Sequence, residues 1–162
     1  MIVTKIKGVD KVVLPEITVL GKEGIGLSSA ATSWVAPLWD EMNQHFDEVI
    51  PFIDATEIEN LHLWGLMSDQ QNWLAPWGET GRYLAGVQVK PGTIAPEGWS
   101  VWVLPAQTYL TLKTDGEKID RATEIMLEQV LPLEKVTLAG AVQEHYLPNF
   151  AEGEVALYFP VQ

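Results

Sequence analysis

The sequence predicts an α+β domain in which two pseudo-symmetric modules of the β-α-β-β type, with antiparallel pairing, surround a central ligand groove. A short motif recurs, because residues 13–20 read VLPEITVL and residues 103–110 read VLPAQTYL. Each copy is followed by one stretch of helical periodicity and then by two apolar segments. Strands therefore do not alternate singly with helices, which argues against a doubly wound parallel fold.

Each copy of the repeated motif predicts two strands around a proline. Pro15 and Pro105 interrupt the apolar runs, and a proline cannot donate a hydrogen bond to a neighbouring strand. We therefore interpret each copy as a Pro-interrupted hairpin. The glycines at positions 21, 24 and 26 follow the first copy and are typical of a turn or bulge.

One amphipathic helix is expected in each half, near 34–48 and near 117–130. Apolar side chains at helical spacing define the buried faces, which are Leu38, Met42, Phe46 and Val49 in the first helix and Ile119, Ala122, Ile125, Met126 and Val130 in the second. Two further strands are expected after each helix, at 61–69 and 82–89 and then at 141–149 and 153–161.

The repeated order predicts one domain over residues 1–162 with an internal duplication of about 1–92 and 93–162. A chain of this length can bury a full core without covalent staples. Ligands commonly bind in the concave seam between two modules. The alternative is a seam that is fully packed by side chains.

The composition excludes several classes of function. The chain has no cysteine, which excludes disulfides, thiolate metal sites and thiol nucleophiles. Its three histidines lack metal-ligand spacing, and no phosphate-binding loop or serine-hydrolase motif is present. We therefore expect neither a metal nor a cofactor.

The charge balance points to the kind of partner. Acidic residues outnumber basic ones by 22 to 10, giving a net charge of -12. Such a surface disfavours nucleic acid and anionic membranes and favours a cationic ligand or a basic protein partner. The alternative is that the charge serves solubility alone. No apolar run is long enough to span a bilayer, and the N-terminal MIVTKIKGVDK lacks a signal-peptide core, so we expect a cytoplasmic protein.

Several segments, in the order in which they follow along the chain, resemble the GyrI-like effector-binding domain family. They are RYLAGVQV at 82–89, Pro96-Glu97-Gly98 with the following WSVWVLPAQTYLTLKTDG, the strand Gln143-Glu144-His145-Tyr146-Leu147, and the ending LYFPV at 157–161. The resemblance implies two modules around a groove. It also implies an effector-binding domain like those of multidrug-responsive transcription regulators, in which a groove glutamate receives lipophilic cations among aromatic rings. That glutamate corresponds to Glu144.

The same resemblance keeps other functions open. Some relatives of this kind are hydrolases that open strained rings of alkylating compounds, and others are gyrase inhibitors. A hydrolase would use Glu144 and Tyr146 as catalytic residues, and an inhibitor would be an acidic protein-interaction module. The 162 residues contain no helix-turn-helix segment, so we expect a freestanding binding domain for a hydrophobic, cationic or amphipathic small molecule.

Glu144 is the leading candidate on chemical grounds as well. Strand alternation in AVQEHYLPN places Val142, Glu144 and Tyr146 on one face and Gln143 and His145 on the other. An inward carboxylate is costly unless it is paired, so it either attracts a cation or acquires a raised pKa and acts as a general acid or base. The alternatives are a solvated face or a pair with Arg or Lys.

Aromatic residues supply the other candidates for ligand binding: Trp39, Trp64, Trp102, Tyr109, Tyr146, Tyr158 and also His62. An ungapped alignment of LWGLMSD with QEHYLPN places Trp64 opposite Glu144 across the groove. Each ring could instead belong to the core. Trp73 and Trp77 lie in the loop QQNWLAPWGET and predict either a lid over the groove or a plug that stabilises the fold.

Overall fold

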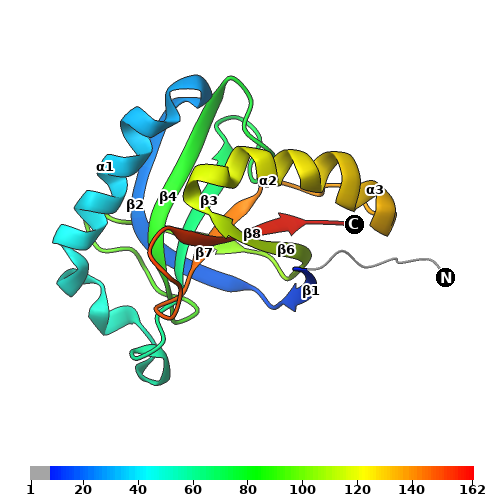
Figure 1. Ribbon diagram of the computed structural model, residues 1–162. Helices are drawn as coiled ribbons and strands as arrows, with labels where there is room; N and C mark the ends of the chain where they lie inside the picture. The colour runs from blue at the N-terminus through cyan, green and yellow to red at the C-terminus, as the bar shows by residue number, and fades with distance from the viewer. Residues whose placement is uncertain (1–7) are drawn as a thin grey trace.

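The computed structural model of the protein describes residues 8–162, and the first seven residues of the N-terminal segment discussed above lie outside them. Eight strands form one antiparallel sheet (Figure 1). They are β1 (Val9–Leu14), β2 (Ile17–Leu27), β3 (Leu63–Asp69), β4 (Thr80–Val89), β5 (Ser100–Leu104), β6 (Gln107–Asp115), β7 (Gln143–Tyr146) and β8 (Glu154–Pro160).

The helices are α1 (Ala31–Gln44), α2 (Ile119–Ile125) and α3 (Leu131–Glu134), and a π-helical turn over Met126–Val130 joins α2 to α3. The element order confirms the predicted succession of two strands, a helix and two strands in each half. The first helix ends before residue 48, and 3-10 turns follow it at Phe46–Glu48 and Ile50–Phe52.

The predicted hairpins are wrong. The sheet order is β1-β6-β8-β7-β3-β4-β2-β5, so β1 pairs with β6 and β5 pairs with β2. The two strands of each VLP motif therefore lie in opposite halves of the sheet. Only Pro15 and Glu16 link β1 to β2, and this short link turns the chain away from its own preceding strand instead of folding it back.

Both major helices cover the same face of the sheet, which we call the helix face. In Figure 1, α1 runs along β2 and β4 and α2 lies over the other half of the sheet, where it contacts β6. The α1 core contains Met42 and Val87, and the α2 core contains Met126 and Leu157. Between these two cores lie β3 and β7, the central strands of the sheet.

A third core covers the other side of the sheet, which we call the opposite face. It contains Trp64, Leu66, Leu84 and Trp102, all buried, with Leu74 packed against them. Because side chains alternate along a strand, each central strand contributes to both faces. The sheet thus separates two buried environments by a single layer of backbone.

Candidate functional site

Glu144 lies on the helix face, on the strand between the two helix-covered halves. In the sheet register it is opposite Gly65 of β3 and Leu157 of β8. Only 9% of its surface is exposed. The predicted alternation along β7 is confirmed, because Glu144 and Tyr146 meet on this face while His145 stacks on Trp64 on the other.

Two phenol hydroxyls hold the carboxylate, and an indole holds one of these phenols. We call this cluster the Glu144 network: Trp39, Tyr83, Glu144 and Tyr146. The Tyr83 hydroxyl donates to Glu144 Oε1 at 2.5 Å, and the Tyr146 hydroxyl donates to the same oxygen at 3.1 Å. Trp39 Nε1–H donates to the Tyr83 hydroxyl at 2.9 Å. The carboxylate therefore accepts hydrogen bonds from β4 and from its own strand, and α1 supports it through Tyr83.

A glycine makes room for this network. Gly65 lies beside Glu144 in the register, and a Cβ there would overlap both the Tyr83 hydroxyl and Glu144 Oε1. A side chain at this position would force the two groups apart. Gly65 thus allows the phenol of β4 to reach the carboxylate of β7 across β3, as the close approach of two groups over a strand requires.

Burial shifts the ionisation of the whole cluster. Desolvation raises the pKa of Glu144, and the hydrogen bonds from Tyr83 and Tyr146 oppose that rise only in part. The pKa values of Tyr83 and Tyr146 are raised as well, by burial first and then by the charge of Glu144. No Lys or Arg of residues 8–162 forms an ion pair with this carboxylate. The site is therefore an acid without a cationic partner.

Two cavities meet at Tyr146. One, of about 310 Å³, is lined by Trp39, Asn43, Leu63 and Tyr146. The other, of about 350 Å³, extends from Tyr146 toward Phe150 and Val155. Glu144 lines neither cavity, whereas Tyr146 lines both. Tyr146 thus contacts both the open space and the buried carboxylate.

The structure brings together three of the predicted site residues, Glu144, Tyr146 and Trp39. Trp39 packs edge-on against Tyr146 with ring centroids 5.5 Å apart. The sequence reasoning missed Tyr83, although it lies in the RYLAGVQV segment that carries part of the family resemblance. Its distance in sequence from Glu144 gave no reason to join the two.

Trp64 is not opposite Glu144, so the ungapped alignment is wrong by one residue. The register pairs Trp64 with His145 and Gly65 with Glu144. A slip of one residue moves a side chain to the other face of a sheet. Trp64 therefore lies on the opposite face, where its ring stacks on His145 at 4.0 Å.

Three further predicted residues also lie on the opposite face rather than beside Glu144. Trp102 belongs to the same core as Trp64. Tyr158 packs edge-on against Trp64 at 5.1 Å and against Tyr109 at 5.5 Å. The prediction of a single groove for all these rings is therefore wrong, because alternate strand positions sent them to the other side.

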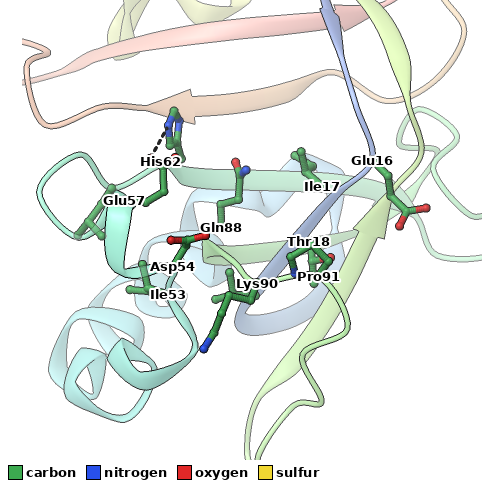
Figure 2. A pocket seen from close by; sticks show the side chains of 12 residues that line it. Glu16, Ile17, Thr18, Ile53, Asp54, Glu57, His62, Gln88, Lys90 and Pro91 are labelled. Atoms are coloured by element: carbon green, nitrogen blue, oxygen red, sulfur yellow. Dashed lines mark ion pairs between the residues drawn. The ribbon is translucent and has the colours of Figure 1, made fainter.

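His62 shares the opposite face with Trp64, as its parity predicts, and so it does not reach the Glu144 network. Its Nδ1 lies 2.9 Å from His145 Nε2, and its Nε2 lies 3.6 Å from the Glu57 carboxylate. Figure 2 shows His62 and Glu57 with Asp54 and Lys90 around a separate cavity of about 130 Å³. Desolvation and the neighbouring His62 lower the pKa of His145 to about 3.

The two loop tryptophans separate, and neither forms a lid over Glu144. Trp77 stacks on Trp34 at 5.4 Å and donates from Nε1 to the Arg82 carbonyl. Trp73 lies edge-on to Trp102 at 4.8 Å, on the opposite face. The plug interpretation fits Trp77, because a Cβ at Gly81 would overlap its ring.

Within residues 8–162, no cluster of three or more His, Asp or Glu side chains is placed to hold a metal ion. None of the helices described is long and apolar enough to cross a membrane. The candidate site therefore consists of a carboxylate, phenols and indoles.

The eight-stranded antiparallel sheet with α1 and α2 on one face is an α+β fold, as the sequence predicts. The family model for Cass2, described as integron-associated effector binding protein, matches residues 12–161. The chain belongs to this family, and the resemblance predicted from the sequence is confirmed. No curated protein matches the chain.

Solved structures show the same fold at low sequence identity. SAV2435 bound to tetraphenylphosphonium is similar with a TM-score of 0.68 and 12% identity, over 95% of this chain and 93% of that chain. The integron cassette protein VCH_CASS2 of Vibrio cholerae gives 0.65 and 13%, over 96% and 97%. The EcmrR C-terminal domain gives 0.63 and 19%, over 95% and 96%.

Proposed function

We propose that the chain binds a hydrophobic, cationic small molecule on the helix face, between α1 and the α2 half of the sheet, with Glu144 as its counter-charge. One observation carries the proposal: the Glu144 carboxylate is buried, and no cation of the described residues is paired with it. A buried acid without such a partner is costly to ionise. A ligand cation would supply the missing charge.

Tyr146 controls access in this proposal. Its hydroxyl donates to Glu144, and the residue borders both cavities of the helix face. Movement of this side chain would join the cavities and expose Oε1, which Tyr83 would continue to hold in place. Trp39 and Tyr146 would then offer ring surface to the ligand, and a cation against an aromatic ring gains about 0.5–2 kcal/mol.

The electrostatic contribution can be bounded. A unit charge about 5 Å from the carboxylate gains about 3 kcal/mol at an effective dielectric constant of about 20. The free energy needed to deprotonate Glu144 offsets part of this gain, because burial raises the pKa of that carboxyl. Support by analogy comes from SAV2435, a protein of the same fold whose structure holds tetraphenylphosphonium, a lipophilic cation.

Calorimetric titration with tetraphenylphosphonium and with the uncharged triphenylphosphine oxide tests the proposal. We expect saturable binding of the cation, and we expect Glu144→Gln to weaken it about 10- to 100-fold while the neutral compound changes little. Glu128→Gln is the matched control, because Glu128 is exposed on the helix that joins α2 to α3 and its replacement changes the net charge equally. Equal losses in both variants would contradict a local role for Glu144.

A ring-opening hydrolase is a second candidate. The contact that favours it is the one between Tyr146 and Glu144, which places a phenol hydroxyl and an acid of raised pKa side by side beneath a cavity. An enzyme could use such a pair to deliver and accept a proton. Mass spectrometry of a cyclopropane-bearing alkylating compound incubated with the protein would reveal the addition of water. An unchanged mass would argue against hydrolysis and leave the binding role.

A further inference from the structure

We propose that a cavity on the opposite face of the sheet is a second small-molecule site, for an uncharged planar aromatic compound that carries a hydrogen-bond acceptor. The cavity lies between the loop at residues 73–75, the bend between β5 and β6, and the segment 139–141. The proposal does not depend on Glu144, because that side chain lies on the helix face.

The cavity has the size of a small aromatic molecule. Its volume is about 260 Å³. A closed apolar cavity of about 150 Å³ is enough for benzene. A compound of two fused rings therefore fits the space.

A phenol that forms no hydrogen bond to another described residue lines this cavity. Tyr109 lines it and is only 4% exposed, yet its hydroxyl has no hydrogen-bond partner within residues 8–162. Burial raises the pKa of this phenol to about 12, so it stays a protonated donor. The buried phenols of the helix face differ, because Tyr83 and Tyr146 both donate to Glu144. The hydroxyl is not among the buried unpaired side-chain atoms of the described residues, so water reaches it through the cavity, and a ligand acceptor would take the place of that water.

The walls exclude charge. None of the twelve lining residues is an Asp, Glu, Lys, Arg or His. The buried amide of Gln143 is already engaged, because it exchanges hydrogen bonds with the backbone of Met67. A cation or an anion would lose its hydration here without gaining a counter-charge. The occupant must therefore be neutral.

The mouth of the cavity carries an aromatic platform on a fixed loop. Trp73 is 52% exposed, and its ring lies edge-on to Trp102 with the ring centroids 4.8 Å apart. The next residue, Leu74, has a φ of 60°, which is strained for a leucine. Its N–H donates to Ser68 Oγ at 2.8 Å, and its carbonyl accepts from the Ala141 N–H at 2.8 Å. The loop is thus held in one shape, with a tryptophan ring left free for stacking.

Coumarin and naphthalene distinguish the two parts of the proposal. Both have two fused rings and no charge, but only coumarin offers a carbonyl acceptor to Tyr109. We expect coumarin to bind the full chain saturably, and we expect Tyr109→Phe to lower its affinity about fivefold, as the loss of one hydrogen bond predicts. Naphthalene affinity should change less than twofold in the same variant. Amide chemical-shift changes should lie in residues 73–75 and 139–141.

Two further variants fix the location. Ala139→Phe would fill the cavity from an exposed position, and Trp73→Ala would remove the platform. Both should weaken coumarin, whereas Glu144→Gln and saturation with tetraphenylphosphonium should leave it unchanged. Unchanged thermal unfolding of each variant would exclude loss of fold as the cause. The proposal is overturned by absence of coumarin binding, by displacement of coumarin with tetraphenylphosphonium, or by equal affinity in wild type and Ala139→Phe.

Discussion

The buried polar side chains on the two faces of β7 have different hydrogen-bond partners. On the helix face, Glu144 is held only by hydroxyls of side chains, one of which borders open space. On the opposite face, Gln143 is bonded at both ends of its amide to the backbone of Met67. His145 is stacked flat on Trp64 in a neutral form. The four-residue strand β7 thus carries a buried acid on the helix face and neutral polar side chains on the opposite face.

This difference explains which face can respond to a charged ligand. Release of the Gln143 amide would break two hydrogen bonds at once and leave both backbone groups of Met67 without these partners. The Tyr146 hydroxyl can leave Glu144 by rotation of one side chain, at a cost of about 1–3 kcal/mol for the lost charge-assisted bond. On the helix face, Glu144 can therefore exchange the Tyr146 hydroxyl for a ligand, whereas the hydrogen bonds of Gln143 on the opposite face are already complete.

The largest change in stability is expected at Gly65, which leaves the space where Tyr83 and Glu144 meet. Gly65→Val should lower the free energy of unfolding by about 3 kcal/mol, because its side chain would overlap Tyr83 and Glu144. Urea denaturation measures this change. Gly116→Ala is the control, because the nearest atom to its new Cβ is a carbonyl oxygen at 3.4 Å. A Gly65→Val protein as stable as wild type would show that Tyr83 and Glu144 need not meet.

How far the sequence predicts this arrangement depends on the range of each interaction. The alternation that places Glu144 with Tyr146 and against His145 is local to one strand, and it is predicted correctly. Tyr83 is missed because its meeting with Glu144 requires the strand order β7-β3-β4. That order follows from tertiary packing, and no local pattern specifies it.

Two of the wrong predictions concern how strands pair, through their register in one case and their partners in the other. Trp64 is assigned to the wrong face because an ungapped alignment is off by one position in the actual register, and one position reverses a side chain. The VLP motifs are assigned as hairpins because adjacent strands usually pair. Here the two strands of each motif pair in opposite halves of the sheet, with Pro15 and Pro105 between them. The motif does not specify which strands become their partners. The internal duplication stays a prediction.

The second largest effect is the pH dependence of cation binding on the helix face. Burial raises the pKa of Glu144, and only its ionised form attracts a cation. Affinity for tetraphenylphosphonium should therefore fall as pH falls through that pKa, by up to about tenfold per pH unit. Tyr83→Phe removes a hydrogen bond that lowers this pKa, so it should move the fall to higher pH. Titrations from pH 4 to pH 9 measure both, and a flat profile in wild type would contradict the ionisation of Glu144 on binding.

In the unliganded protein, His145 on the opposite face and Glu144 on the helix face should change the stability with pH in opposite directions. The folded-state pKa of His145 is lowered to about 3, so folding favours its neutral form. Its contribution is complete above its unfolded pKa of about 6.5 and is lost as pH falls toward 3, by up to about 1.4 kcal/mol per pH unit. The raised pKa of Glu144 acts oppositely, because its contribution is lost as pH rises. Urea midpoints of His145→Gln and Glu144→Gln should therefore flatten opposite ends of the pH profile.

The smallest effect is the coupling between the two faces, which we expect to be nearly zero. Glu144 and Tyr109 share no hydrogen bond or ring contact and project from opposite sides of the sheet. The stability changes of Glu144→Gln and Tyr109→Phe should add to within about 0.5 kcal/mol in the double variant. Tyr83→Phe and Tyr146→Phe should not add, because both hydroxyls donate to one oxygen of Glu144 and the loss of one strengthens the other. Strong coupling across the faces would mean that ligand occupancy on one side of the sheet is transmitted to the other.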